Sequence, residues 1–196
     1  HMARDVKDIL KAEKIETCVL MGHCFGGLVA YTFAEQFPDY LKGLVLISVG
    51  ARQPYILGYE PIKKATHMLV RTIAPYGFRR HTSAHADYSL GKYEHDFEPI
   101  GLFRVVMHNS LRSYLYLTNE VFSFGGLETF HSLHMPTLLL SGTKDSVYPL
   151  QGIIAVHKQI EGSELKYIEG ANHPTVLNQP MEVAFAIQQF LRKISF

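Results

Sequence analysis

The stretch MGHCFGG (21–27) decides the fold that this sequence predicts. It overlaps the end of a short apolar, β-leaning run, TCVLM (17–21), which suits a buried strand. It precedes LVAYTFAEQF (28–37), whose apolar residues recur at helical spacing until Pro38 ends the helix. A strand, the pattern G-x-C-x-G and a helix together predict a nucleophile elbow, a sharp turn that holds a reactive side chain in a strained backbone conformation.

Cys24 is the nucleophile that this turn predicts. The glycines two residues before and two residues after it, Gly22 and Gly26, leave room for the strand and the helix to pack closely. The side chain then projects at the carboxyl end of the strand, where α/β proteins build their sites. Its place at a helix N-terminus favours a thiolate. From the turn alone, the alternative is a glycine-rich strand-to-helix turn that carries a buried, inert cysteine.

Strands and helices alternate on both sides of the elbow. Further strands are predicted at 43–49, 136–142 and 164–170, and further helices at 3–14, 151–160 and 181–194. Alternation of this kind means βαβ crossovers, and these produce a parallel sheet with helices on both faces. The predicted fold class is therefore α/β, with a parallel sheet and flanking helices.

One long segment interrupts the alternation. Residues 52–133 separate the second and third strands, which is far more than one crossover needs. The segment has helical patches at 63–73 and 101–117, and we expect a mostly helical insertion over the end of the sheet. The predicted domains are a core formed by residues 3–51 and 134–196 and a helical cap formed by residues 52–133.

Two further residues complete a candidate catalytic set with Cys24. The sequence SGTKDSVYP follows the third strand and places Asp145 in the loop at its carboxyl end. The sequence GANHPTVLNQP follows the fourth strand and places His173 in the next loop. All three residues then lie at one end of a parallel sheet. Chemically, His173 would take the proton of Cys24 and return it to a leaving group, while Asp145 would orient the imidazole.

The order of these motifs resembles the α/β-hydrolase superfamily. The resemblance runs from the GHCFGG elbow through GTKDSVYP to the GANHP loop. It implies a helical cap at the position of the long insertion and hydrolysis of a small-molecule ester or thioester through a covalent acyl-enzyme. It also implies that the backbone N–H of Phe25, the residue after the nucleophile, is one donor of the oxyanion hole.

The sequence departs from this family in two respects. Most members carry serine at the elbow; Cys24 can be native, as in the dienelactone hydrolases that use cysteine, or can replace a serine. Family members also have several strands before the elbow, and here one helix precedes it. We therefore expect either a fragment of a longer enzyme or a natural half-fold. The rival to an acyl hydrolase is a non-catalytic half-fold that serves as a binding or assembly module.

Composition limits the partners and the compartment. The net charge of +1 gives no reason to expect nucleic acid, and the apolar runs are too short to span a bilayer. Cys18 and Cys24 lie too far apart along one strand for a disulfide, and free thiols favour a cytoplasmic protein. We also expect the uncovered strand at residues 17–21 to pair, in a homodimer or with the missing N-terminal portion.

No cofactor or metal is expected. His81 and His85 stand four residues apart, with His95 and Asp96 nearby, but neither paired cysteines nor an H-E-x-x-H pattern supports a metal site. Asp87 and Asp96 are alternatives to Asp145 as the acid of the triad. They lie in the insertion and lack a strand end that would fix them.

Overall fold

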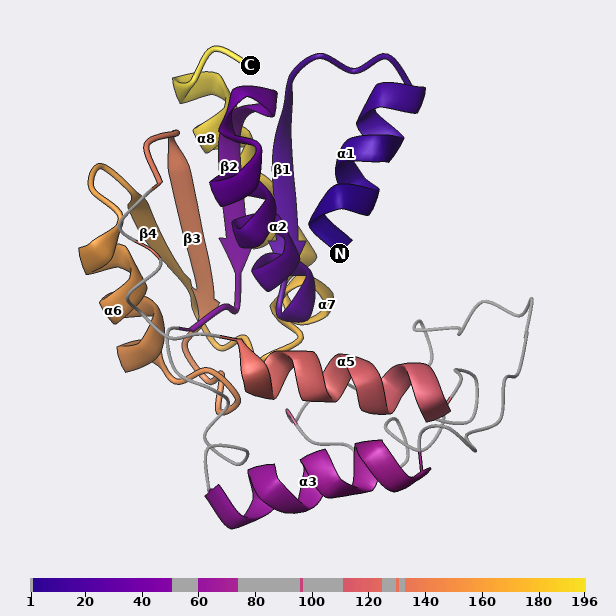
Figure 1. Ribbon diagram of the computed structural model, residues 1–196. Helices are drawn as coiled ribbons and strands as arrows, with labels where there is room; N and C mark the ends of the chain where they lie inside the picture. Colours follow the sequence, from indigo (N-terminus) through magenta and orange to yellow (C-terminus); the bar gives the residue numbers. More distant parts are fainter. Residues whose placement is uncertain (1, 51–59, 74–95, 97–110, 125–129, 131–132) are drawn as a thin grey trace.

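Four parallel strands form one sheet in the order β1-β2-β3-β4 (Figure 1). The computed structural model describes residues 2–50, 60–73, 96, 111–124, 130 and 133–196. The strands are β1 (Cys18–His23), β2 (Leu41–Ile47), β3 (Thr137–Gly142) and β4 (Glu164–Ile168). The α/β class and the four predicted strands are confirmed, and each strand begins and ends within two residues of its predicted limits.

Helices connect and flank these strands. They are α1 (Met2–Ala12), α2 (Phe25–Gln36), the short 3-10 helix η1 (Pro38–Tyr40), α6 (Leu150–Gln159), α7 (Thr175–Asn178) and α8 (Pro180–Lys193). The helix after the elbow ends where Pro38 was expected to stop it. None of the described helices is both long and apolar enough to cross a membrane.

Both faces of the sheet are covered, as a buried parallel sheet requires. The alternation of side chains along β2 divides the core, because successive residues point to opposite faces. Leu44 and Leu46 belong to a cluster that includes side chains of α1, α2 and α6. Val45 and Ile47 belong to a second cluster that includes side chains of α8. This double cover fixes the sheet rigidly and leaves its carboxyl end to the loops.

Two helices of the long insertion lie at that end of the sheet. They are α3 (Glu60–Ile73) and α5 (Leu111–Ser123), and Figure 1 shows them beyond the points of β1 and β2. Val70 and Leu115 are buried against each other, and His67 Nδ1 lies 3.0 Å from Asn119 Oδ1. The predicted helices are confirmed where residues are described; residues 101–110 lie outside that part. The cap boundaries at 52 and 133 stay a prediction.

Candidate active site

The turn at Cys24 has the backbone geometry of a nucleophile elbow. Cys24 lies between β1 and α2 with φ 51° and ψ −119°, a conformation that side-chain-bearing residues rarely adopt. Such strain costs of the order of 1–3 kcal/mol and persists only where the surroundings enforce it. Here the Cys24 N–H donates to the carbonyl of Ile47 at 2.9 Å, which extends the pairing of β1 with β2 into the turn.

Close packing at the elbow depends on two glycines, only one of which was predicted. A Cβ atom on Gly22 would lie 2.3 Å from the carbonyl oxygen of Gly26, so the glycine two residues before Cys24 is confirmed as a packing requirement. A Cβ on Gly26 would meet nothing within 4 Å. On the helix side the tight position is Gly27, where a Cβ would lie 2.2 Å from Cγ2 of Val49. The expectation for Gly26 is therefore wrong, because the first turn of α2 directs that position away from the strands.

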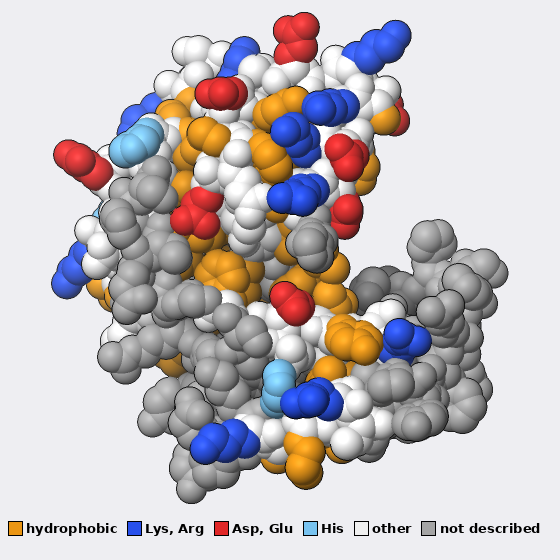
Figure 2. All heavy atoms as spheres, viewed as in Figure 1, with side chains coloured by type: hydrophobic (Ala, Val, Ile, Leu, Met, Phe, Trp, Pro, Cys, Tyr) orange, Lys and Arg blue, Asp and Glu red, His pale blue; other side chains and the backbone are white. Residues whose placement is uncertain are grey.

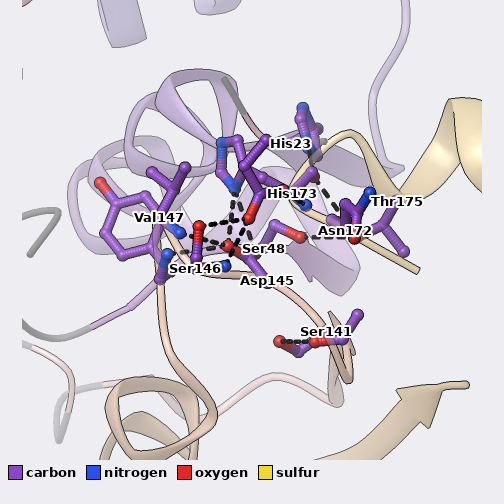
Figure 3. A network of polar contacts seen from close by, with 12 residues as sticks. His23, Ser48, Ser141, Asp145, Ser146, Val147, Asn172, His173 and Thr175 are labelled. Carbon is purple, nitrogen blue, oxygen red and sulfur yellow. Dashed lines mark hydrogen bonds and ion pairs between the residues drawn. The ribbon is translucent and has the colours of Figure 1, made fainter. Parts of the chain in front are cut away.

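Asp145 is fixed in the loop after β3 by its own backbone. Its side chain is fully buried, and Oδ1 accepts hydrogen bonds from the N–H groups of Val147 at 3.0 Å and Tyr148 at 2.8 Å. Oδ2 lies 3.0 Å from Nδ1 of His173. In Figure 3 the dashed contacts converge on this carboxylate. A buried carboxylate held at both oxygens can orient an imidazole without turning away from it.

His173 joins the carboxylate to the thiol. Its Nδ1 contacts Asp145, and the thiol of Cys24 lies close enough to its side chain to raise its pKa. Burial by itself lowers the pKa of His173, but the hydrogen bond to Asp145, the neighbouring Cys24 and the negative charges of both outweigh burial and raise it to about 10. The three residues predicted from the sequence thus meet at one point, and the imidazolium form is favoured at neutral pH.

Two aromatic side chains hold the His173 ring from its sides. The ring of His23 lies 5.2 Å from it and that of Tyr148 lies 5.7 Å from it, measured between centroids. Nε2 of His23 lies 2.8 Å from the His173 carbonyl; because a carbonyl only accepts, this nitrogen carries the proton. Burial lowers the pKa of His23, which keeps it neutral. Neither contact was predicted, although His23 adjoins Cys24 and Tyr148 follows Asp145 by three residues.

The loops of the acid and the histidine lie in direct contact. A Cβ on Gly142 would lie 2.2 Å from the carbonyl oxygen of Ala171, so only glycine permits this approach. The N–H of Thr143 donates to Ile168 at 3.0 Å and that of Lys144 donates to Ala171 at 2.9 Å. These main-chain bonds continue the pairing of β3 with β4 and bring Asp145 within reach of the histidine loop.

Asp96 contacts the loops that carry Asp145 and His173, although it does not contact the His173 imidazole. Its Oδ2 accepts hydrogen bonds from both N and Oγ of Ser146 at 2.6 Å, and its Oδ1 accepts one from the N–H of His173. Between the two candidate acids whose positions are described, Asp145 is therefore the one on the ring. Asp87 lies outside the described residues.

The remaining predicted site features are an oxyanion donor and the absence of a metal. Phe25 begins α2, so its N–H is one of the first-turn groups that have no intrahelical acceptor. Among the described residues, no three His, Cys, Asp or Glu side chains are arranged to hold a metal ion. His81, His85 and His95 lie outside those residues.

Charges on the visible face around α1 and α2 are mixed. Figure 2 shows Lys and Arg side chains interspersed with Asp and Glu side chains on this face, with no continuous basic stripe.

Both cysteines are free, and burial raises the pKa of the Cys18 thiol. Cys18 therefore differs chemically from Cys24, whose thiol lies beside the His173 imidazole.

Comparisons with known proteins identify the family to which the fold belongs. The family model described as "alpha/beta hydrolase fold" matches residues 1–180. Epoxide hydrolase 1 of Caenorhabditis elegans is 22% identical over 218 residues, which cover 98% of this chain and 52% of that protein. Serine hydrolase BPHL of Homo sapiens is 24% identical over 199 residues, which cover 97% of this chain and 60% of that protein. The chain thus spans between half and three fifths of the length of these two relatives.

Solved structures share the fold. A thermophilic esterase from Thermogutta terrifontis superposes with a TM-score of 0.72 at 22% sequence identity, and the match covers 98% of this chain and 71% of that one. A hydrolase from Pseudomonas aeruginosa PA01 superposes with a TM-score of 0.70 at 20% identity over 96% of this chain. At these identities the likeness concerns the arrangement of strands and helices.

Proposed function

Since the chain belongs to the alpha/beta hydrolase fold family, we propose that it contributes the catalytic triad of an acyl hydrolase that cleaves a carboxylic ester or a thioester. The proposed nucleophile is Cys24, the proposed acid–base is His173, and the proposed orienting carboxylate is Asp145. The proposal concerns the whole protein to which this sequence belongs, because the matched relatives are longer than this chain.

In the first half of the reaction the Cys24 thiolate attacks the carbonyl carbon of the substrate. The carbonyl oxygen takes up the negative charge, which the N–H of Phe25 stabilises. When the tetrahedral intermediate collapses, the bond to the leaving oxygen or sulfur breaks and the His173 imidazolium gives that atom its proton. The products of this step are a free alcohol or thiol, a neutral imidazole and an acyl thioester on Cys24.

In the second half water releases the acyl group. Neutral His173 removes a proton from a water molecule as that water attacks the thioester carbonyl. The carbon–sulfur bond then breaks, and the carboxylic acid leaves while the thiolate and the imidazolium are restored. Asp145 remains ionised throughout and stabilises the imidazolium in both halves. The sum is one ester or thioester plus water giving one acid and one alcohol or thiol, so no cofactor is needed.

One observation carries this proposal: the His173 imidazole hydrogen-bonds with a buried carboxylate through Nδ1 and lies beside the thiol of a strained elbow. A histidine with a purely structural role has no need of a neighbouring thiol, and a cysteine with a purely structural role has no need of a strained backbone. The substrate we propose is small to medium in size and has an apolar acyl part.

The test is incubation with short-chain and medium-chain p-nitrophenyl esters, followed by intact mass. We expect release of p-nitrophenol and an acyl adduct on Cys24. Cys24→Ala should abolish both, and Cys18→Ala should retain both. An equal rate in Cys24→Ala and the unchanged protein would reject the thiol as nucleophile.

The second candidate function is assembly through the outer strand. Among the described strands β1 lies at the edge of the sheet, and Met21 on it is 43% exposed. An uncharged edge strand is a template for pairing with another chain. We propose that β1 pairs in a homodimer or with the remaining N-terminal portion of the fold. Light scattering at micromolar concentration tests this, and a monomer at all concentrations would speak against the homodimer.

Because both thiols are free, we place the protein in the cytoplasm.

A further inference from the structure

Asp96 is the only described residue between α3 and α5, and it contacts both loops of the candidate triad. One carboxylate accepts three hydrogen bonds there. Oδ2 takes the N–H and the hydroxyl of Ser146, which directly follows Asp145, and Oδ1 takes the N–H of His173 itself. Hydrogen bonds to an ionised acceptor are shorter and roughly twice as strong as bonds between neutral groups.

The contacts of Asp96 span long sequence distances. Asp96 precedes Ser146 by 50 residues and His173 by 77. The acid loop and the histidine loop are each anchored to a strand, but Ser146 and His173 lie several residues beyond the ends of β3 and β4. The Asp96 carboxylate accepts hydrogen bonds from both residues at a place where the pairing of β3 with β4 no longer extends.

The backbone of His173 is consequently held at both of its polar groups. Its N–H donates to Asp96, and its carbonyl accepts from Nε2 of His23. The main chain of this residue therefore cannot shift without breaking a hydrogen bond to another element. A ring attached to a main chain held in this way keeps its distance to Asp145.

We propose that Asp96 is a positioning residue, a carboxylate of the insertion that fixes the acid loop against the histidine loop so that Asp145 and His173 stay within hydrogen-bonding distance. The inference rests on the proposed function for its catalytic meaning. It also predicts a measurable property of His173 that does not depend on turnover. The insertion would then help to assemble the triad in addition to any part it has in covering it.

The variants Asp96→Asn and Asp96→Ala separate this role from ordinary stability. Both oxygens of Asp96 accept hydrogen bonds, so an asparagine amide must turn its NH₂ group toward a donor on one of the two loops. Alanine loses the hydrogen bonds to both loops. Among the residues that the structure describes, the groups around the His173 imidazole are Asp145, Cys24, His23 and Tyr148. Asp96 does not contact the ring, so its loss reaches the imidazole through a change of position or through the removal of its charge. Both variants remove that charge, so a larger fall of the His173 pKa with alanine than with asparagine reports the change of position.

The experiment measures the pKa of His173 by NMR, the rate at which iodoacetamide alkylates Cys24, and unfolding in urea. In both variants we expect the pKa of His173 to fall by about one unit or more, a tenfold change in its protonation equilibrium. Alkylation at pH 7 should slow in parallel. Glu120→Gln is the matched control, because Glu120 is an exposed carboxylate on α5 of the same insertion, and it should stay within about twofold of the unchanged protein.

The outcomes are distinct. An unchanged pKa of His173 in a folded Asp96→Asn protein would overturn the inference, and so would global unfolding of both variants, because the proposed effect is confined to two loops. If the pKa falls in the variants but the unchanged protein cleaves no ester, the proposed function fails and the role of Asp96 stands. If the protein hydrolyses esters through Cys24 and the pKa of His173 does not change in the variants, the proposed function stands and the role of Asp96 fails.

Discussion

Replacing Gly22 by alanine introduces a methyl group into the closest contact of the elbow. The new Cβ would lie 2.3 Å from the carbonyl oxygen, 2.5 Å from the carbonyl carbon of Gly26 and 2.6 Å from Cα of Gly27. Side-chain carbons essentially never come closer than 3.0 Å to such atoms. All three are main-chain atoms of the first turn of α2, so no flexible side chain can move aside and the helix itself must shift by about 0.7 Å.

The magnitude follows from the rigidity of both partners. β1 is hydrogen-bonded to β2, and α2 packs its buried side chains, such as Phe33, into the core. Overpacking of this kind typically costs about 1–3 kcal/mol of unfolding free energy. The reduced entropy of the unfolded chain returns about 0.4–1 kcal/mol. We therefore expect Gly22→Ala to destabilise the protein by roughly 1–2 kcal/mol after this offset, and to displace Cys24 from His173.

Gly26→Ala is the matched control, four residues away in the same turn. Its Cβ would meet nothing within 4 Å, and it lies in α2 with no positive φ. Alanine there should stabilise the protein by about 0.5–1 kcal/mol. Urea unfolding followed by circular dichroism measures both changes, and iodoacetamide labelling measures Cys24. Equal stability of the two variants, or a less stable Gly26→Ala, would falsify the account of the elbow.

Three further predictions concern the thiol, the triad and pH. Iodoacetamide at neutral pH should label Cys24 before Cys18, because burial raises the pKa of Cys18; intact mass with peptide mapping decides, and faster labelling of Cys18 would count against the elbow. His173→Ala should slow both Cys24 alkylation and ester hydrolysis, and Asp145→Asn should reduce hydrolysis by up to about 10⁴-fold by leaving the imidazole badly oriented; unchanged rates in both would remove them from the mechanism. The pKa of His173 rises from 6.5 to about 10 on folding, so its contribution to stability is complete below pH 6.5 and disappears as the pH rises through about 10. Urea unfolding of the unchanged protein and of His173→Gln should therefore show a difference in unfolding free energy that shrinks over this pH interval. A difference that grows with pH would contradict the ion pair between His173 and Asp145.

The fold and the placement of Cys24, Asp145 and His173 at one end of the sheet could be predicted from sequence because each depends on a local pattern. An apolar run of strand length, a glycine-spaced turn and a helical period identify β1, the elbow and α2 without knowledge of the rest of the chain. Parallel strands have their carboxyl ends at one edge, so residues that follow β1, β3 and β4 had to meet there. Cys24, Asp145 and His173 follow those strands, and their meeting is a consequence of topology.

Tertiary structure alone decided which neighbours hold these residues. The sequence could not distinguish Gly26 from Gly27, because the difference is the direction in which the first turn of α2 points a Cβ. Nor could it assign Asp96 to the loops of Asp145 and His173, since those contacts join segments 50 and 77 residues apart. Local patterns fix the conformation of each segment, whereas contacts between distant loops depend on how the completed sheet and the insertion pack together, which no periodicity in the chain encodes.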